Sequence, residues 1–181
     1  FCPSFEEAYY MLDKDEYLTS GTTEISPDLI HSLIDKILSY GAKIAFLKLG
    51  DFGGVLGIAK QLSAETIGKA WYSGLKSWEN RRIWAPSFKV DVIGTTGAGD
   101  ASIAGFLASL LNELSIEEAL LMAEGVGACN VEAIDSVSAV RSWKETALRI
   151  NRGWPQNPLY FSDQSDWKWM PEFHLWEKQV Q

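Results

Sequence analysis

Two helix starts are marked near the beginning of the chain. Ser4 and Glu7 have the spacing of a capping box, so a helix should begin after Ser4. Ser26 followed by Pro27 is typical of a second helix start. Apolar residues recur at helical spacing after Pro27, and Gly41 is placed to end that helix. The first forty residues are therefore expected to be mainly helical.

The middle of the chain has the pattern of strands. Residues 43–50, KIAFLKLG, form a short apolar run typical of a buried parallel strand. A glycine-rich turn follows, and residues 55–59 fit a returning strand. Residues 63–80 fit either a helix or a loop, whereas residues 82–94 should be extended because Pro86 opposes a helix. Helices and buried strands in this order predict an α/β layer fold.

The second half of the chain returns to helical periodicity. Residues 101–114 form an apolar helix, and a second helix begins near Ser115. A third helix covers residues 142–150, and the Trp-rich tail that follows has no clear period, so it should be irregular and packed on the body. Four small residues share one side of the first helix and predict close packing there: Ala101, Ala104, Gly105 and Ala108.

Composition narrows the classes of function. The 181 residues suit one domain, and the formal net charge of −8 opposes a broad nucleic-acid surface. No apolar run is long enough to span a bilayer, so no membrane partner is expected. Cys2 and Cys129 are too few for a disulfide framework and indicate a cytoplasmic protein with reduced thiols. Because it opens on Phe1, the chain is expected to be cut from a longer protein.

The glycine-rich turn at residues 94–100, GTTGAGD, carries the clearest chemical signal. It opens a helix, so the amides of Gly97, Ala98, Gly99 and Asp100 should point outward and bind an anionic oxygen. Asp100 could accept a proton from an alcohol at the same place, or could simply complement the helix dipole. The turn is no Walker A loop, because no Gly-Lys-Ser/Thr follows, and it fits a dinucleotide fingerprint poorly.

Three motifs in order resemble the ribokinase-like (PfkB) carbohydrate kinases. TTGAGD is similar to the family signature Asp-Thr-Thr-Gly-Ala-Gly-Asp, KLGDFGG to its phosphate-side turn, and PSFEE to its Asn-x-x-Glu motif. The resemblance covers residues 3–150. It implies the ribokinase-like layered α/β/α sheet, present as an incomplete carboxyl-terminal part. Residues 1–150 would form the nucleotide-binding and catalytic part, and residues 151–181 the Trp-rich irregular tail.

The resemblance also implies roles for individual residues. Asp100 matches the general base, and Gly97, Ala98 and Gly99 match the anion hole for the transferred phosphoryl group. Glu7 matches the acid that organises Mg²⁺ through water, although a capping-box role fits it equally well.

The residues that would lie beside the nucleotide are Lys48, Gly50, Gly53, Thr95, Thr96 and Asn130. Lys48 could instead be a solvated lysine at a strand end. Asn130 would face the adenine from the last nucleotide-side helix, or could be a polar residue on the helix surface.

The chain departs from the family pattern in three ways. Gly94 replaces an Asp that commonly helps to hold a monovalent cation, which leaves cation activation doubtful. Ser102 stands where an aromatic residue often lies. The family's amino-terminal half, with most sugar-binding residues, is absent, so a sheet edge or a partner surface should be exposed.

The function implied by the resemblance is ATP- and Mg²⁺-dependent phosphorylation of a hydroxyl on a sugar or sugar-like small molecule. The alternatives are a nucleoside or vitamin-precursor kinase of the same superfamily, or a catalytically silent nucleotide-binding or partner-binding remnant. Without the missing half the chain should have little activity, since orientation supplies much of the rate. Its partners would be the small-molecule substrate and either the amino-terminal half or a second copy of the chain.

Other residues with potential chemistry have simpler explanations. His31 and His174 lack neighbours at metal-ligand spacing, so neither is expected to bind a metal. Arg81 and Arg82 are expected to lie in a solvated turn rather than to clamp a phosphate.

Overall fold

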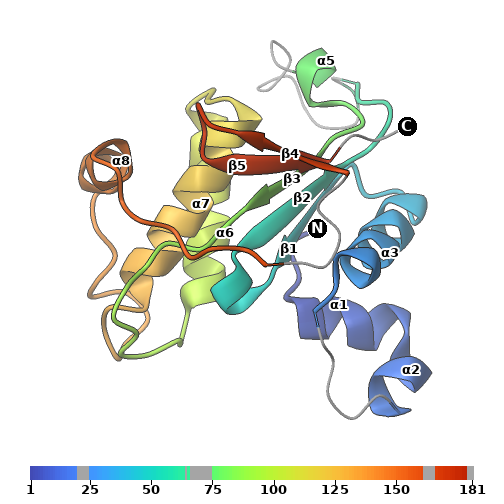
Figure 1. Cartoon of the computed structure of the whole chain (residues 1–181), viewed down its shortest axis with the longest axis horizontal. Helices are drawn as coiled ribbons and strands as arrows, with labels where there is room; N and C mark the ends of the chain where they lie inside the picture. The colour runs from blue at the N-terminus through green and yellow to red at the C-terminus, as the bar shows by residue number, and fades with distance from the viewer. Residues whose placement is uncertain (20–24, 64, 66–74, 161–165, 179–181) are drawn as a thin grey trace.

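The fold is a twisted sheet with helices on both faces (Figure 1). The computed structural model describes residues 1–19, 25–63, 65, 75–160 and 166–178. The five strands of the described sheet are β1 (Ile44–Lys48), β2 (Gly54–Ile58), β3 (Arg82–Ala85), β4 (Trp167–Met170) and β5 (Leu175–Lys178). They lie in the order β1-β2-β3-β5-β4.

Every pairing between these named strands is antiparallel. The expectation of a parallel strand at residues 43–50 is therefore wrong for the β1–β2 pair, because the short 3-10 turn η1 (Gly50–Phe52) returns the chain directly. On its other edge β1 does have a parallel neighbour. The Phe46 amide donates to the Phe1 carbonyl at 2.8 Å, and Ser4 bridges Lys48 in parallel.

The helices begin where their caps predict. Ser4 and Ser115 each form a complete capping box, at α1 (Phe5–Leu12) and α7 (Ile116–Asn130), and Ser26 caps α3 (Pro27–Ser39). Two further helices are α6 (Ala98–Leu111) and α8 (Trp143–Asn151), which Ser142 caps. Two short helices complete the described elements, α2 (Lys14–Thr19) and α5 (Leu75–Trp78), and most of residues 63–80 lies outside the described part. Within the described residues, no helix combines the length and apolarity needed to cross a membrane.

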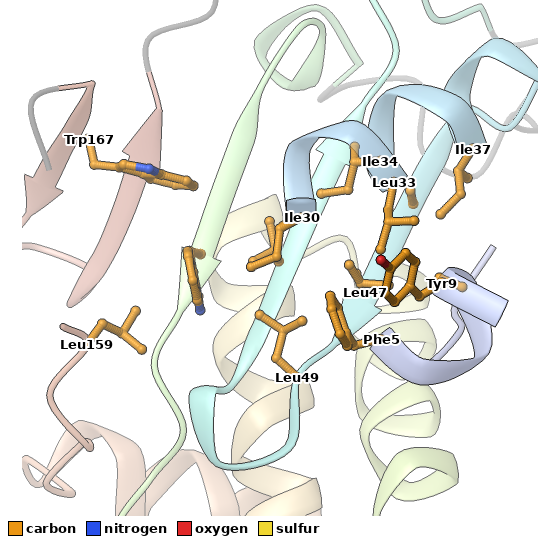
Figure 2. Close-up of a cluster of buried hydrophobic side chains, with 14 residues drawn as sticks. Phe5, Tyr9, Ile30, Leu33, Ile34, Ile37, Leu47, Leu49, Leu159 and Trp167 are labelled. Atoms are coloured by element: carbon orange, nitrogen blue, oxygen red, sulfur yellow. The ribbon is translucent and has the colours of Figure 1, made fainter. Parts of the chain in front are cut away.

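Successive side chains along the strands point to opposite faces of the sheet, and each face has its own buried core. Leu47 and Trp84 belong to the core on the face covered by α1 and α3. Figure 2 shows Leu47 there with Phe5, Ile30 and Leu33. The opposite face of the sheet packs on α6 and α7. Its buried cluster includes Phe46, Leu56, Ile83, Phe106 and Leu120.

The contact between α6 and α7 differs in part from the expected small-residue face. Gly105 is buried, and a Cβ there would lie 3.0 Å from both the Met122 carbonyl oxygen and Val126. Ala104, however, is exposed. The close approach instead runs through Ser102, since a Cβ on Gly127 would lie 2.2 Å from the Ser102 Oγ. The helix is therefore rotated by about one position from the orientation that its alanines suggest.

The tail is not irregular where it was expected to be. β4 and β5 form a hairpin, and β5 pairs with β3, so the tail adds two strands to the sheet. Trp167 lies in the core beside Trp84, with 5.6 Å between ring centroids in a T-shaped arrangement. The sequence pattern missed these strands because each has only four residues, too few to establish an alternating pattern.

Arg81 and Arg82 do not lie in a solvated turn. The Arg81 guanidinium lies 2.6 Å from the Glu117 carboxylate and 2.5 Å from that of Glu177. Arg82 is only 7% exposed and pairs with Asp35 at 2.6 Å. The two arginines thus connect the start of β3 to both helical layers and to β5.

Candidate active site

A cavity of about 890 Å³ opens where the β1–β2 turn, the start of α6 and the face of α7 converge. Its polar end includes Ser4, Lys48, Gly50 and Gly99. Its apolar end is formed by Phe88, Val90, Ala128 and Val131. A cavity of this size with one polar end can hold a cofactor-sized ligand.

The start of α6 depends on Gly97, which adopts the left-handed conformation with φ of 78°. The Ala98 amide donates to the Thr95 carbonyl at 3.2 Å, so the expectation that all four amides of this turn are free is wrong for Ala98. The amides of Gly97, Gly99 and Asp100 make no hydrogen bond to other described residues. Three donors thus remain available at the positive end of the helix dipole.

Lys48 lies at the end of β1 and lines the cavity beside the start of α6. A Cβ on Gly99 would lie 3.0 Å from the Lys48 Nζ, so the missing side chain makes room for the ammonium group. No acidic side chain of the described residues lies within salt-bridge distance of Lys48. Its charge is therefore available to an anion in the cavity.

The turn between β1 and β2 is fixed against β3. Gly53 has φ of 86°, and a Cβ there would lie 2.0 Å from the Ala85 carbonyl oxygen, so no other residue fits. The Trp84 Nε1 donates to the Phe52 carbonyl at 2.8 Å, and the Ser87 Oγ donates to the Asp51 carbonyl at 2.5 Å. Both glycines predicted for the phosphate side, Gly50 and Gly53, line the cavity.

Glu7 is exposed, and its carboxylate is engaged in the helix cap. The Ser4 amide donates to the Glu7 Oε2 at 2.7 Å. This hydrogen bond, followed by the charge of Lys48, lowers the pKa of Glu7 from its usual value. The capping-box interpretation is therefore confirmed, and the metal role stays a prediction. Its neighbour Glu6, rather than Glu7, lines the cavity.

Of Asp100 and the two threonines of the signature, only Thr95 lines the cavity. Asp100 is exposed in the first turn of α6 and does not line the cavity. Thr95 lines it, whereas Thr96 is exposed and does not. The structure thus brings Lys48 and Gly99 together in the cavity and leaves Asp100 facing solvent.

Asn130 is fully buried at the end of α7, so the interpretation as a surface residue is wrong. Its Nδ2 donates to the Ser136 carbonyl at 2.5 Å, and its Oδ1 has no partner among the described residues. Asn130 does not line the cavity. Its contacts show it holding the loop that follows α7, and contact with an adenine ring stays a prediction.

Glu124 is a cavity residue that the sequence analysis did not identify. It is 9% exposed on α7, and a Cβ on Gly54 would lie 2.5 Å from its Oε1. Burial raises the pKa of Glu124 to about 8. One signal could have identified it, because Glu124 is the only charged residue between Glu118 and Glu132.

The chain has the fold of the ribokinases. The ribokinase of Thermotoga maritima superposes with a TM-score of 0.59 at 21% identity, covering 82% of this chain and 41% of its own. The Arabidopsis thaliana ribokinase, solved with ribose and ATP, gives a TM-score of 0.57 at 22% identity and covers 81% and 38%. The chain therefore spans about two fifths of these solved structures.

Residues 69–142 match the pfkB family of carbohydrate kinases, which confirms the family resemblance for that part of the chain. A relative named probable fructokinase-6, chloroplastic, from Arabidopsis thaliana is 44% identical over 59 residues. That alignment covers 29% of this chain and 15% of the relative. The family match includes the glycine-rich turn and α7 but not Glu7 or the Gly50–Gly53 turn.

Proposed function

We propose that the chain forms the nucleotide-binding side of a sugar kinase and holds ATP in the cavity. The observation that carries the proposal is the Lys48 ammonium over Gly99, beside the open amides of α6. Because the whole chain has a net charge of −8, a polyphosphate needs such a local positive site. The apolar end of the cavity, with Phe88 and Val131, suits a purine ring.

The whole protein would transfer the terminal phosphoryl group of ATP to a hydroxyl of a sugar or sugar-like molecule. Asp100 takes the hydroxyl proton as the new O–P bond forms, and the bond from the terminal phosphorus to its bridging oxygen breaks. Gly99 and Lys48 stabilise the charge on the transferred group. A bound Mg²⁺ would neutralise phosphate charge. Glu7, which is ionised near Lys48 but does not line the cavity, would hold it through water, since Mg²⁺ keeps most of its water and needs few carboxylates.

The acceptor is a sugar in this proposal because the matched family is one of carbohydrate kinases and a neighbour in fold is solved with ribose. A nucleoside or vitamin precursor presents a similar hydroxyl to the same base. The acceptor side would be completed by the part of the fold that this chain does not span.

A second candidate function is nucleotide binding without turnover. It is favoured by the position of Asp100, which is exposed and does not line the cavity. The described residues therefore form no wall that would hold a sugar against Asp100. Catalysis needs both reactants oriented in line, so this chain alone should bind ATP and phosphorylate little.

Calorimetric titration with ATP and Mg²⁺ tests the proposal. Lys48→Ala should weaken ATP binding by about tenfold, the loss typical of one charge-assisted contact. Asp100→Asn should bind within about twofold of the parent chain, because a base affects turnover rather than binding. Lys144→Ala, an exposed change on α8, is the matched control. Absence of ATP binding by the parent chain would refute the proposal.

A sugar-phosphorylation assay distinguishes the two candidates. The 181-residue chain should show no turnover with ATP, Mg²⁺ and a panel of sugars, and the whole protein should show turnover that Asp100→Asn abolishes. Turnover of the whole protein that survives Asp100→Asn would exclude Asp100 as the base. No turnover by the whole protein would favour the silent nucleotide-binding function.

A further inference from the structure

The tail runs antiparallel to the segment that follows β3. Gln156 bridges Phe88, the Lys89 amide donates to the Pro155 carbonyl at 2.8 Å, and the Asn157 amide donates to the Ser87 carbonyl at 2.8 Å. Phe88 and Lys89 line the cavity. Residues 154–157 therefore form a second layer behind one cavity wall.

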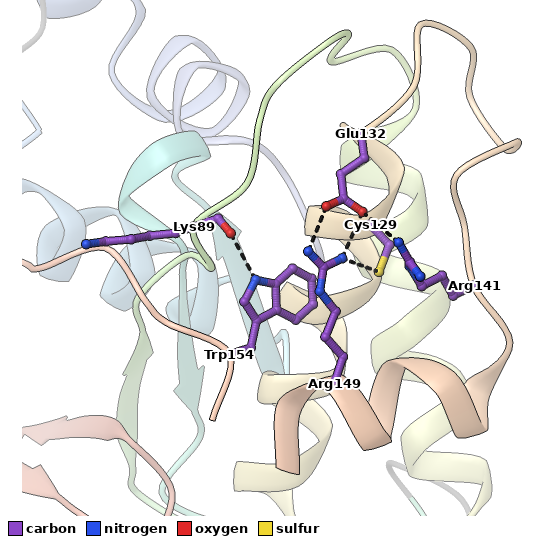
Figure 3. A network of polar contacts seen from close by, with 6 residues as sticks. All are labelled: Lys89, Cys129, Glu132, Arg141, Arg149 and Trp154. Carbon is purple, nitrogen blue, oxygen red and sulfur yellow. Dashed lines mark hydrogen bonds and ion pairs between the residues drawn. The ribbon is translucent and has the colours of Figure 1, made fainter. Parts of the chain in front are cut away.

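Trp154 is buried between the apolar ring of Phe88 and the cationic side chain of Arg149, and Figure 3 shows it with Arg149. Its ring stacks on Phe88 with 4.6 Å between centroids and 20° between planes. The Arg149 guanidinium lies 3.5 Å from the centroid of the same ring, and the Trp154 Nε1 donates to the Lys89 carbonyl at 2.9 Å. Stacking, cation–π attraction and a hydrogen bond thus fix the orientation of one tail residue against the wall.

Arg149 is itself held by Glu132 (Figure 3). The guanidinium donates to both carboxylate oxygens, at 2.8 and 2.7 Å. These hydrogen bonds are the main cause of the lowered pKa of Glu132, so the pair stays charged at neutral pH. The stack therefore ends on an ion pair that joins α8 to the residues after α7.

Asn157 reaches the cavity from the same tail segment. Its Nδ2 donates to the Ser87 Oγ at 2.9 Å, and that hydroxyl donates in turn to the Asp51 carbonyl. Asn157 lines the cavity, and its Oδ1 accepts no hydrogen bond from the described residues. A polar side chain is thus held at the wall with one acceptor left for a ligand.

We propose that residues 154–157 are part of the ligand site: Asn157 contacts the bound nucleotide, and Trp154 positions Phe88 as the wall against which the nucleotide base lies. The proposal rests on the function proposed above. It assigns a role to the tail, which lies beyond residues 69–142, the part that the family comparison matches.

ATP titrations of tail variants test this inference. Trp154→Ala should weaken ATP binding by about tenfold, in line with the loss of one ordered aromatic wall. Trp154→Phe should restore binding to within about threefold, because it retains a ring to stack on Phe88. Trp169→Ala, a half-exposed tail tryptophan outside the cavity, should bind like the parent chain. Asn157→Ala should weaken binding by about threefold or more.

A ¹⁹F NMR spectrum of the chain labelled with 5-fluorotryptophan supplies an independent readout. The Trp154 resonance, assigned from its loss in Trp154→Phe, should shift on addition of ATP, and the Trp169 resonance should not. Normal ATP binding by folded Trp154→Ala and Asn157→Ala would overturn the inference and leave the proposed function standing. If Trp154→Ala does not fold, two other results together overturn the inference: a Trp154 resonance of the parent chain that does not shift on addition of ATP, and normal ATP binding by Asn157→Ala. A parent chain that does not bind ATP refutes both proposals.

Discussion

Glu124 is a buried acidic side chain that lines the cavity beside Gly54. No hydrogen bond or ion pair reaches it from the described residues, and burial alone raises its pKa to about 8. The protonated form therefore predominates at neutral pH in the folded chain. Its carboxyl group can then act as a hydrogen-bond donor toward the cavity.

The raised pKa of Glu124 makes stability depend on pH. Between the usual value of 4.5 and about 8 the folded chain binds more protons than the unfolded chain, so its stability falls as pH rises through this window. Glu124→Gln removes this dependence. At pH 9 the variant should melt at least about 3 °C above the parent chain, the shift that about 1 kcal/mol produces in a domain of this size.

At pH 5 the Glu124→Gln variant and the parent chain should melt at nearly the same temperature. Calorimetry of both proteins between pH 5 and pH 9 measures the difference. Glu172→Gln, an exposed acid in the β4–β5 turn, serves as the control and should show no such divergence. Equal melting temperatures of Glu124→Gln and the parent chain at pH 9 would contradict the buried, neutral state of Glu124.

At the level of elements, α6 and α7 approach closely where small residues of the two helices meet. Ser102 and Gly105 on α6 face Val126 and Gly127 on α7. The glycine-rich turn opens α6, and Glu124 lies on α7. The distance between the two helices therefore sets the width of the cavity between the turn and Glu124.

Gly127→Ala should destabilise the chain by about 1–3 kcal/mol, because its Cβ would lie 2.2 Å from the Ser102 Oγ. Combining it with Ser102→Ala should recover most of that loss. The next nearest atoms are the Ala98 carbonyl oxygen at 3.4 Å and the Ser102 Cβ at 3.5 Å, which are ordinary contacts. Urea unfolding of both single variants and the double variant gives the coupling. Additive effects would show that the two residues do not clash.

The sequence predicted those elements that local chemistry determines. The helix starts at Ser4, Ser26 and Ser115 follow from a hydroxyl that caps the residues after it, and the structure confirms them. Strand direction was not predictable in this way. The apolar run of β1 would have the same composition in a parallel or an antiparallel pair. The Gly50–Gly53 turn makes the β1–β2 pair antiparallel.

The candidate site was also predictable in part: its motif residues were, and its long-range contacts were not. Lys48, Gly50, Gly53 and Gly99 all line the cavity, because the motif spacing fixes their place at strand and helix ends. The burial of Asn130 depends on its bond to the Ser136 carbonyl in the loop after α7, and Asn157 joins the wall from the tail. Such long-range pairings leave no periodic pattern in a single sequence.

At the scale of the whole molecule, the tail is part of the folded body. β5 pairs with β3, Trp167 packs in the α1–α3 core, and Leu175 packs in the opposite one. Both faces of the sheet thus bury residues from the last fifteen described positions, and unfolding of the tail should accompany unfolding of the body.

Trp167→Ala should destabilise the whole chain by about 3–5 kcal/mol, since the ring is 6% exposed and contacts both Trp84 and His31. Trp169→Ala, on the same hairpin but half-exposed, should cost less than about 1.5 kcal/mol. Chemical denaturation followed by circular dichroism measures both. If Trp167→Ala unfolds with the parent's midpoint, the tail is an independent appendage.

The attachment of the Gly50–Gly53 turn to β3 has a consequence for how the cavity fills. The turn is pinned to β3 by the Trp84 and Ser87 bonds, and the space beyond Gly53 is taken by the Ala85 carbonyl. It cannot swing aside as a flap without breaking these two hydrogen bonds. Under the proposed function, a nucleotide would therefore load through the mouth as it stands, and any gating motion would come from another side of the cavity.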